Sequence, residues 1–178
     1  MSGKMPTLFY KKVQYFKKTG RKLKGEDKMI EAVQEQELVL TTNTDAITFS
    51  NIDLRTNSAQ CFNGWLNYNQ GSAQFNIVEG GIYEIDFGTN ITSTETGQVA
   101  LAIYQNGTKI NGTEMDATIS TAGNWRNISA TKRIRVCGRG VLTITIQSVP
   151  SVNISGTPTD TEIPTIKNAN IILRRIGN

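Results

Sequence analysis

The stretch GGIYEIDFGTNIT, residues 80–92, alternates apolar and polar side chains as a strand of an antiparallel sheet does. Tyr83, Ile85 and Phe87 fall on one face of this strand, whereas Glu84 and Asp86 fall on the other. One face of such a strand packs against a core while the other faces solvent. The sequence therefore predicts a half-buried strand with its two carboxylates on the solvent side.

The next segment, TGQVALAIYQNGTKI (96–110), predicts a β-hairpin. Asn106-Gly107 can supply the positive φ angles that a tight two-residue hairpin turn requires. The strand before this turn is apolar on both faces, and its second face carries Ala100, Ala102 and Tyr104. We expect both faces of such a strand to be buried. The simplest way to bury the second face is contact with a second subunit.

Short β-like runs separated by Gly, Asn, Thr and Ser clusters continue from Leu38 to the end of the chain. This pattern predicts an all-β protein, an antiparallel sandwich of the jelly-roll kind. The final run, ANIILRRIG (169–177), is again apolar on both faces, through Ile172 and Ile176 among others. We expect this last strand to lie centrally in a sheet.

The first 30 residues differ in composition from the rest. They carry nine basic side chains against two acidic ones, a net charge of +7, so residues 31–178 carry −3 of the total of +4. Lysine pairs alternate here with aromatic pairs. We interpret this segment as an arm that anchors the protein to a partner surface, because docking buries aromatic side chains that a solvated basic tail would leave exposed. The predicted anchoring residues are Phe9, Tyr10, Lys11, Lys12, Tyr15, Phe16, Lys17, Lys18 and Arg21.

The segment EDKMIEAVQEQ (26–36) follows the arm. Asp27 is a suitable N-cap for a short helix that would present Met29, Ile30 and Val33 on one side. The sequence thus predicts three parts: a basic aromatic arm over 1–30, a connector helix over 31–37, and a jelly-roll head over 38–178.

Composition excludes several function classes. The chain has no histidine, which removes the most common general base and metal ligand, and it has no phosphate-binding or dinucleotide-binding glycine motif. Two cysteines, Cys61 and Cys137, are too few for a four-cysteine zinc site, and we expect both to be reduced thiols packed inside the body. We therefore expect no enzymatic activity, no catalytic residues, no metal and no cofactor.

Membrane insertion and secretion are not expected either. The longest apolar run, Val99 to Tyr104, has six residues, whereas a membrane-spanning helix needs about 20. The N-terminus lacks the apolar core of a signal peptide, so we do not expect the chain to be directed through a secretory membrane.

In order and content, these motifs resemble the tumour necrosis factor and complement 1q-like jelly-roll family, in particular its bacterial and bacteriophage members on spore coats and virions. The motifs that carry the resemblance are Gly81 and Tyr83 at the start of a core strand, the Asn106-Gly107 hairpin and the aliphatic last strand. Together they cover roughly Leu38 to Ile176. The resemblance implies a homotrimer with the last strand near the threefold axis. The collagen-like repeats that often precede such heads are absent here, and the basic arm takes their place.

Three hypotheses for function follow. The first is a virion protein, a trimeric capsid decoration or head fibre of a bacteriophage, docked by its arm on the major capsid protein or another virion protein. The second is a receptor-binding tip whose loops, such as the one with Trp125 and Arg126, contact a glycan or protein on the host surface. The third, binding of nucleic acid or an anionic membrane surface through the arm, is disfavoured because charge alone does not need the aromatic residues. The trimer interface is predicted to contain Ala100, Ala102, Tyr104, Ile172 and Ile176.

Overall fold

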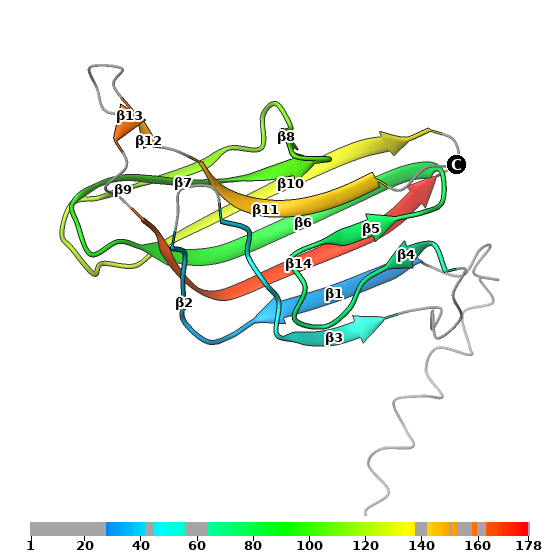
Figure 1. Ribbon diagram of the computed structural model, residues 1–178, viewed down its shortest axis with the longest axis horizontal. Coiled ribbons are helices and arrows are strands. Elements are labelled where there is room, and N and C mark those ends of the chain that lie inside the picture. Colours follow the sequence, from blue (N-terminus) through cyan, green and yellow to red (C-terminus); the bar gives the residue numbers. More distant parts are fainter. Residues whose placement is uncertain are drawn as a thin grey trace, which may run out of the picture.

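The computed structural model describes residues 28–41, 45–55, 64–137, 142–149, 151–152, 158–159 and 163–177. In this part of the chain two antiparallel sheets face each other, as Figure 1 shows. The strands of the first sheet are, in spatial order, β10 (Arg126–Val136), β6 (Gly81–Thr92), β14 (Thr165–Gly177), β1 (Met29–Gln34) and β3 (Asn51–Arg55), with β2 (Leu38–Val39) also paired to β14. Those of the second sheet are β4 (Leu66–Asn67), β5 (Phe75–Ile77), β11 (Leu142–Val149), β7 (Gly97–Gln105) and β8 (Thr108–Lys109), with β9 (Met115–Ile119) also paired to β7. A separate short ribbon joins β12 (Ser151–Val152) to β13 (Pro158–Thr159).

The core lies between the two sheets and follows the alternation of the strands. Tyr83 and Ile85 of β6 and Leu101 and Ile103 of β7 are fully buried members of one apolar cluster. Burial of alternate residues from both sheets is the expected core of a β-sandwich. The prediction that residues 80–92 form a strand with one core-facing side is therefore confirmed.

The predicted hairpin is also confirmed. Asn106 has φ 50° and Gly107 has φ 76°, and the strands on either side pair through Gln105 and Thr108. Both angles are positive, as the predicted two-residue turn requires.

The final strand lies centrally, as expected, because β14 pairs with β6 on one side and β1 on the other (Figure 1). The predicted connector helix over 31–37 is wrong. Residues Met29–Gln34 form strand β1, which pairs with both β14 and β3. Ile30 and Ala32 have no exposed surface. The buried residues are therefore two positions apart, as in a strand, and not three or four apart, as in a helix. Strand partners far along the chain outweigh a weak local helix preference.

Gly81 begins β6 in a conformation that few other residues can adopt. Its φ is 154°, and a Cβ atom placed on it would lie 2.8 Å from the backbone oxygen of Gly177 and 2.5 Å from Nε of Arg175. The start of β6 and the end of β14 therefore approach each other only because residue 81 has no side chain.

The two cysteines were predicted to pack inside the body. Cys137 directly follows β10 and its side chain is exposed, so the prediction is wrong for this residue. The neighbouring Val136 points to the core, and alternation turns the next side chain outward. Cys61 lies outside the described residues.

Within the described residues no helix is long and apolar enough to cross a membrane.

Candidate functional site

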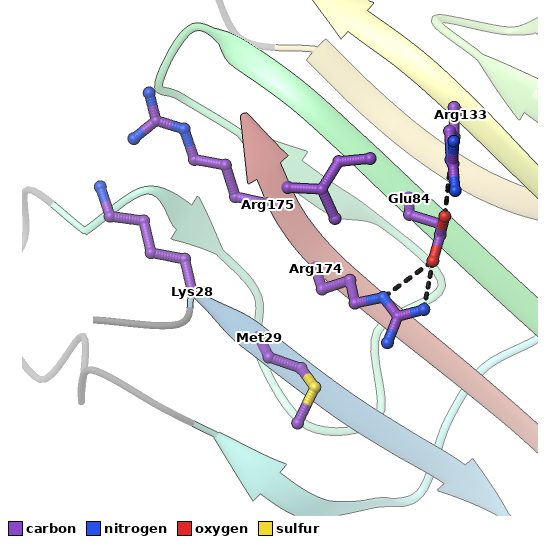
Figure 2. Close-up of a pocket in the computed structure, with 7 residues that line it drawn as sticks. Lys28, Met29, Glu84, Arg133, Arg174 and Arg175 are labelled. Atoms are coloured by element: carbon purple, nitrogen blue, oxygen red, sulfur yellow. Dashed lines mark hydrogen bonds and ion pairs between the residues drawn. The ribbon is translucent and has the colours of Figure 1, made fainter. Parts of the chain in front are cut away.

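A row of charged side chains crosses the outer face of the first sheet. Glu84 on β6 lies opposite Arg133 on β10 and opposite Arg174 on β14. Nε of Arg133 donates a hydrogen bond of 2.7 Å to one carboxylate oxygen of Glu84, and Nε of Arg174 donates one of 2.9 Å to the other. Figure 2 shows the carboxylate held between the two guanidinium groups. The acidic side chain thus bridges three neighbouring strands.

The two arginines cover Glu84 and change its acidity. The side chain of Glu84 is only 6% exposed, so the prediction that it stands on the solvent side is wrong. Its Cβ does point away from the core, but the long arginine side chains on the neighbouring strands shield its carboxylate. Hydrogen bonds from Arg133 and then from Arg174 hold the pKa of Glu84 below its usual range. Asp86, 3.5 Å from Arg174, is more exposed than Glu84.

A second charged cluster ties the start of β1 to the end of β14. Glu79, in the turn before β6, forms ion pairs with Lys28 and with Arg175. A guanidinium nitrogen of Arg175 also donates to the backbone oxygen of Gly80 at 2.8 Å, and its backbone N–H donates to the carbonyl of Lys28 at 2.8 Å. The hydrogen bond from Lys28, with help from the charge of Arg175, lowers the pKa of Glu79. Three chain segments are therefore fixed at one end of the sheet.

A hollow of about 640 Å³ lies between these two clusters. Met29 and Ile176 contribute apolar surface to it, and Figure 2 shows the charged residues around it. The lining residues are Lys28, Met29, Glu84, Arg133, Arg174, Arg175 and Ile176. No group of three or more His, Cys, Asp or Glu side chains suited to a metal ion occurs in the described ranges. The chemistry of this hollow is that of a contact surface, with apolar side chains among paired charges.

A row in which acidic and apolar residues alternate crosses the same face. The register of the sheet places Asp86, Ile172, Glu31 and Leu54 in one row across β6, β14, β1 and β3. Leu54 is 41% exposed and Ile176 is 44% exposed. Among the large apolar side chains that the structure describes, few others are as exposed as these two, so this face of the sandwich is the best candidate for a contact with another molecule.

The five residues predicted for a trimer interface do not lie together. Ile172 and Ile176 are on the outer face of the first sheet, whereas Ala100, Ala102 and Tyr104 are on the outer face of the second sheet. Ala102 has no exposed surface and Ala100 has 6%, although neither belongs to the core cluster. Gln147 of β11 is the cross-strand neighbour of Ala102. Both alanines are buried within the single chain, so their burial does not require a second subunit, and the predicted interface stays a prediction.

The predicted ligand-facing loop joins β9 to β10 at one end of the sandwich. Two hydrogen bonds of 2.9 Å fix it, one from Gly123 N–H to the carbonyl of Ser93 and one from the Thr92 hydroxyl to the carbonyl of Asn124. Arg126 is exposed, whereas Trp125 is half-buried.

Lys167 of β14 lies over the ring of Trp125, with its ammonium nitrogen 3.9 Å from the ring centre. This cation–π contact could not be predicted from local sequence, because the two residues are far apart along the chain. The predicted arm residues, from Phe9 to Arg21, lie outside the described residues.

Comparison with known proteins gives matches of fold alone. No protein-family model and no curated protein matches the sequence. Solved structures do match, each covering 85% of this chain. The globular domain of zebrafish complement 1qA has a TM-score of 0.57 at 10% identity, with 98% of that chain covered. Murine APRIL has 0.56 at 8% identity with 100% covered, and Eiger TNF from S. frugiperda has 0.58 at 5% identity with 94% covered.

These matches settle the fold class. The protein has the jelly-roll fold of tumour necrosis factor and complement 1q-like domains, so the predicted fold class is confirmed.

Proposed function

We propose that the protein is a non-enzymatic structural protein of a virion, a homotrimeric capsid decoration or head fibre of a bacteriophage. In this proposal the part of the arm that precedes β1 (Met29–Gln34) anchors the jelly-roll head to the major capsid protein or another virion protein. The protein assembles in the host cytoplasm and resides on the capsid surface, without a role for nucleic acid or a membrane.

The observation that carries the proposal is the combination of a jelly-roll head with an arm of alternating aromatic and lysine pairs. The described surface offers a contact face, in which apolar side chains lie among paired charges. Three arms on one trimer would bind a capsid together, so that weak individual contacts add up through effective concentration.

The outer face of the first sheet is the surface that we assign to contact between subunits. Leu54, Ile172, Ile176 and Met29 contribute its apolar part, and the Glu84 row contributes paired charges that a neighbouring copy can cover without leaving a charge unpaired. Ile176 is the residue to test because it is exposed at the end of β14. Ile176→Glu should leave the chain folded and shift it to monomers in sedimentation velocity. Thr118→Glu, on the outer face of the second sheet, is the matched control and should remain trimeric.

Docking is tested on virions isolated from the source culture. Purified chain should co-sediment with these particles, and the quadruple change of Phe9, Tyr10, Tyr15 and Phe16 to serine should abolish this at unchanged net charge. Neutralising Lys11, Lys12, Lys17 and Lys18 to glutamine should weaken binding mainly at low salt, where charges act over about 10 Å. If the serine variant still sediments with the particles while the glutamine variant does not, the docked-arm mechanism fails and an electrostatic attachment replaces it.

A second candidate function is recognition of a host-surface glycan or protein by the Trp125 loop. It is favoured by the fixed position of this loop and by the aromatic ring held under Lys167. Trp125→Ala and Arg126→Ala should then abolish adsorption to host cells while leaving attachment to virions unchanged.

A further inference from the structure

Two identical tripeptides, Asn-Gly-Thr at 106–108 and at 111–113, occupy successive turns at one edge of the second sheet. Asn106 and Asn111 are both exposed, and the following glycines have nearly the same φ, 76° at Gly107 and 73° at Gly112. The sequence that follows each asparagine is therefore matched. Any difference in the chemistry of the two sites arises from the folded surroundings.

Asparagine followed by glycine can react with its own backbone. The amide nitrogen of the glycine attacks the side-chain carbonyl carbon of the asparagine, a C–N bond closes a five-membered succinimide, and ammonia leaves. Water then opens the ring at either carbonyl, giving aspartate or isoaspartate. The reaction needs no other reagent, and its slow step requires the glycine N–H to lose its proton and the asparagine side chain to reach that nitrogen.

At Asn106 the fold opposes this reaction. The side-chain oxygen of Asn106 accepts a hydrogen bond of 2.8 Å from the backbone N–H of Thr143, and its own N–H donates one of 2.9 Å to the carbonyl of Thr143. The carboxamide is thereby held against β11. It must break a hydrogen bond before it can approach Gly107.

At Asn111 the fold assists it. The ammonium group of Lys132 donates a hydrogen bond of 2.8 Å to the backbone carbonyl of Asn111. This carbonyl and the N–H of Gly112 belong to the same peptide unit, so the cation draws electron density from the nitrogen that must lose its proton and stabilises the resulting anion.

The surface beside Gly112, the residue that supplies the attacking nitrogen, is open. A Cβ atom placed on Gly112 would have only the Lys132 nitrogen within 4 Å, at 3.8 Å. Among the described residues, no hydrogen bond holds the Asn111 carboxamide. The side chain can therefore turn toward Gly112 without breaking a hydrogen bond.

We propose that Asn111 is a site of self-modification, which converts through a succinimide to aspartate and isoaspartate with Lys132 as the activating residue. Conversion replaces a neutral amide by a carboxylate beside Lys132 and lowers the formal charge of the chain by one from +4. On a long-lived particle the modification would accumulate with age at one defined edge of the sheet.

The test follows the intact protein during incubation at mildly alkaline pH in water enriched in heavy oxygen. Peptide mapping by mass spectrometry then gives separate rates for the peptides of Asn106 and Asn111, and the heavy oxygen marks conversion that occurred during the incubation. Asn63, which also precedes a glycine, is followed as its own peptide. The free energy needed to break the hydrogen bond at Asn106 is by itself enough to make Asn111 convert about twofold to tenfold faster than Asn106.

Three controls separate activation by Lys132 from general flexibility. Lys132→Met should slow conversion at Asn111 and leave Asn106 unchanged, whereas Lys132→Arg should retain the faster rate. Because unfolding would release Asn106 as well, a constant rate at Asn106 reports that the variant is folded. In denaturant the two rates should converge. Equal rates in the folded protein, or an Asn111 rate that Lys132→Met does not change, would overturn the proposal.

Discussion

Gly81 allows β6 and β14 to approach each other, and Gly81→Ala should destabilise the fold strongly. An alanine at φ 154° occupies a region that is nearly exclusive to glycine, which costs about 1–3 kcal/mol. Its Cβ would also lie 2.8 Å from the backbone oxygen of Gly177, and backbone atoms cannot move aside without disturbing the strand pairing. With the steric contribution we expect a total loss of about 2–5 kcal/mol, a large part of a typical stability of about 5–15 kcal/mol.

The measurement is equilibrium unfolding in urea, followed by the fluorescence of Trp65, whose ring stacks on Tyr83 at 5.7 Å. The midpoint should fall by about 1 M or more at an unchanged slope. Gly123→Ala is the matched control, since Gly123 has φ 78° but nothing within 4 Å of the added Cβ, and it should lose only about 1–2 kcal/mol. Equal losses in the two variants would refute the steric argument, and an unchanged midpoint for Gly81→Ala would refute the conformational one as well.

Three further predictions concern buried polar groups. The ionised carboxylate of Glu84, whose pKa is lowered, should stabilise the fold at pH values above the ordinary glutamate pKa. This stabilisation should be lost as the pH falls through the lowered pKa. Glu84→Gln should therefore reduce the fall in the free energy of unfolding at acidic pH. Burial raises the pKa of both Tyr68 and Tyr83 to about 12. The free energy of unfolding should therefore fall as the pH rises from 10 toward 12, by about 2–3 kcal/mol for each tyrosine. Urea unfolding at a series of alkaline pH values measures this loss. Tyr83→Phe should remove its share of this alkaline loss and cost about 1 kcal/mol at neutral pH, because the hydroxyl donates a hydrogen bond of 2.8 Å to the carbonyl of Glu79.

Local periodicity was sufficient to predict the strand over 80–92 and the hairpin. The alternation in 80–92 and the Asn106-Gly107 turn depend on neighbours within a few residues, so both can be predicted from the local sequence. β1 was missed because its partners are distant: Glu31 accepts a hydrogen bond from Asn170, 139 residues away. Nothing in the sequence near residue 31 signals that pairing.

The charged row was missed for the same reason. Arg133 and Arg174 lie 49 and 90 residues from Glu84, and only the register of three strands brings them to one carboxylate. The face that an alternating strand turns away from the core can be predicted, but the side chains that cover this face cannot. The two alanines of β7 show the converse, since they lie outside the core cluster and are nevertheless buried within the single chain.

If the N-terminal arm anchors the protein, as we propose, the placement of β1 has a mechanical consequence. All six residues of β1 pair with β14, and β3 pairs along the other edge, so tension entering the body at Lys28 acts along a strand that is bonded on both sides. Backbone hydrogen bonds lie across the strand axis in an antiparallel sheet. Such a pull loads the hydrogen bonds of β1 in shear, where they must fail together, and not one after another as in the peeling of an edge strand. The ion pairs of Glu79 with Lys28 and Arg175 reinforce the point where the force enters.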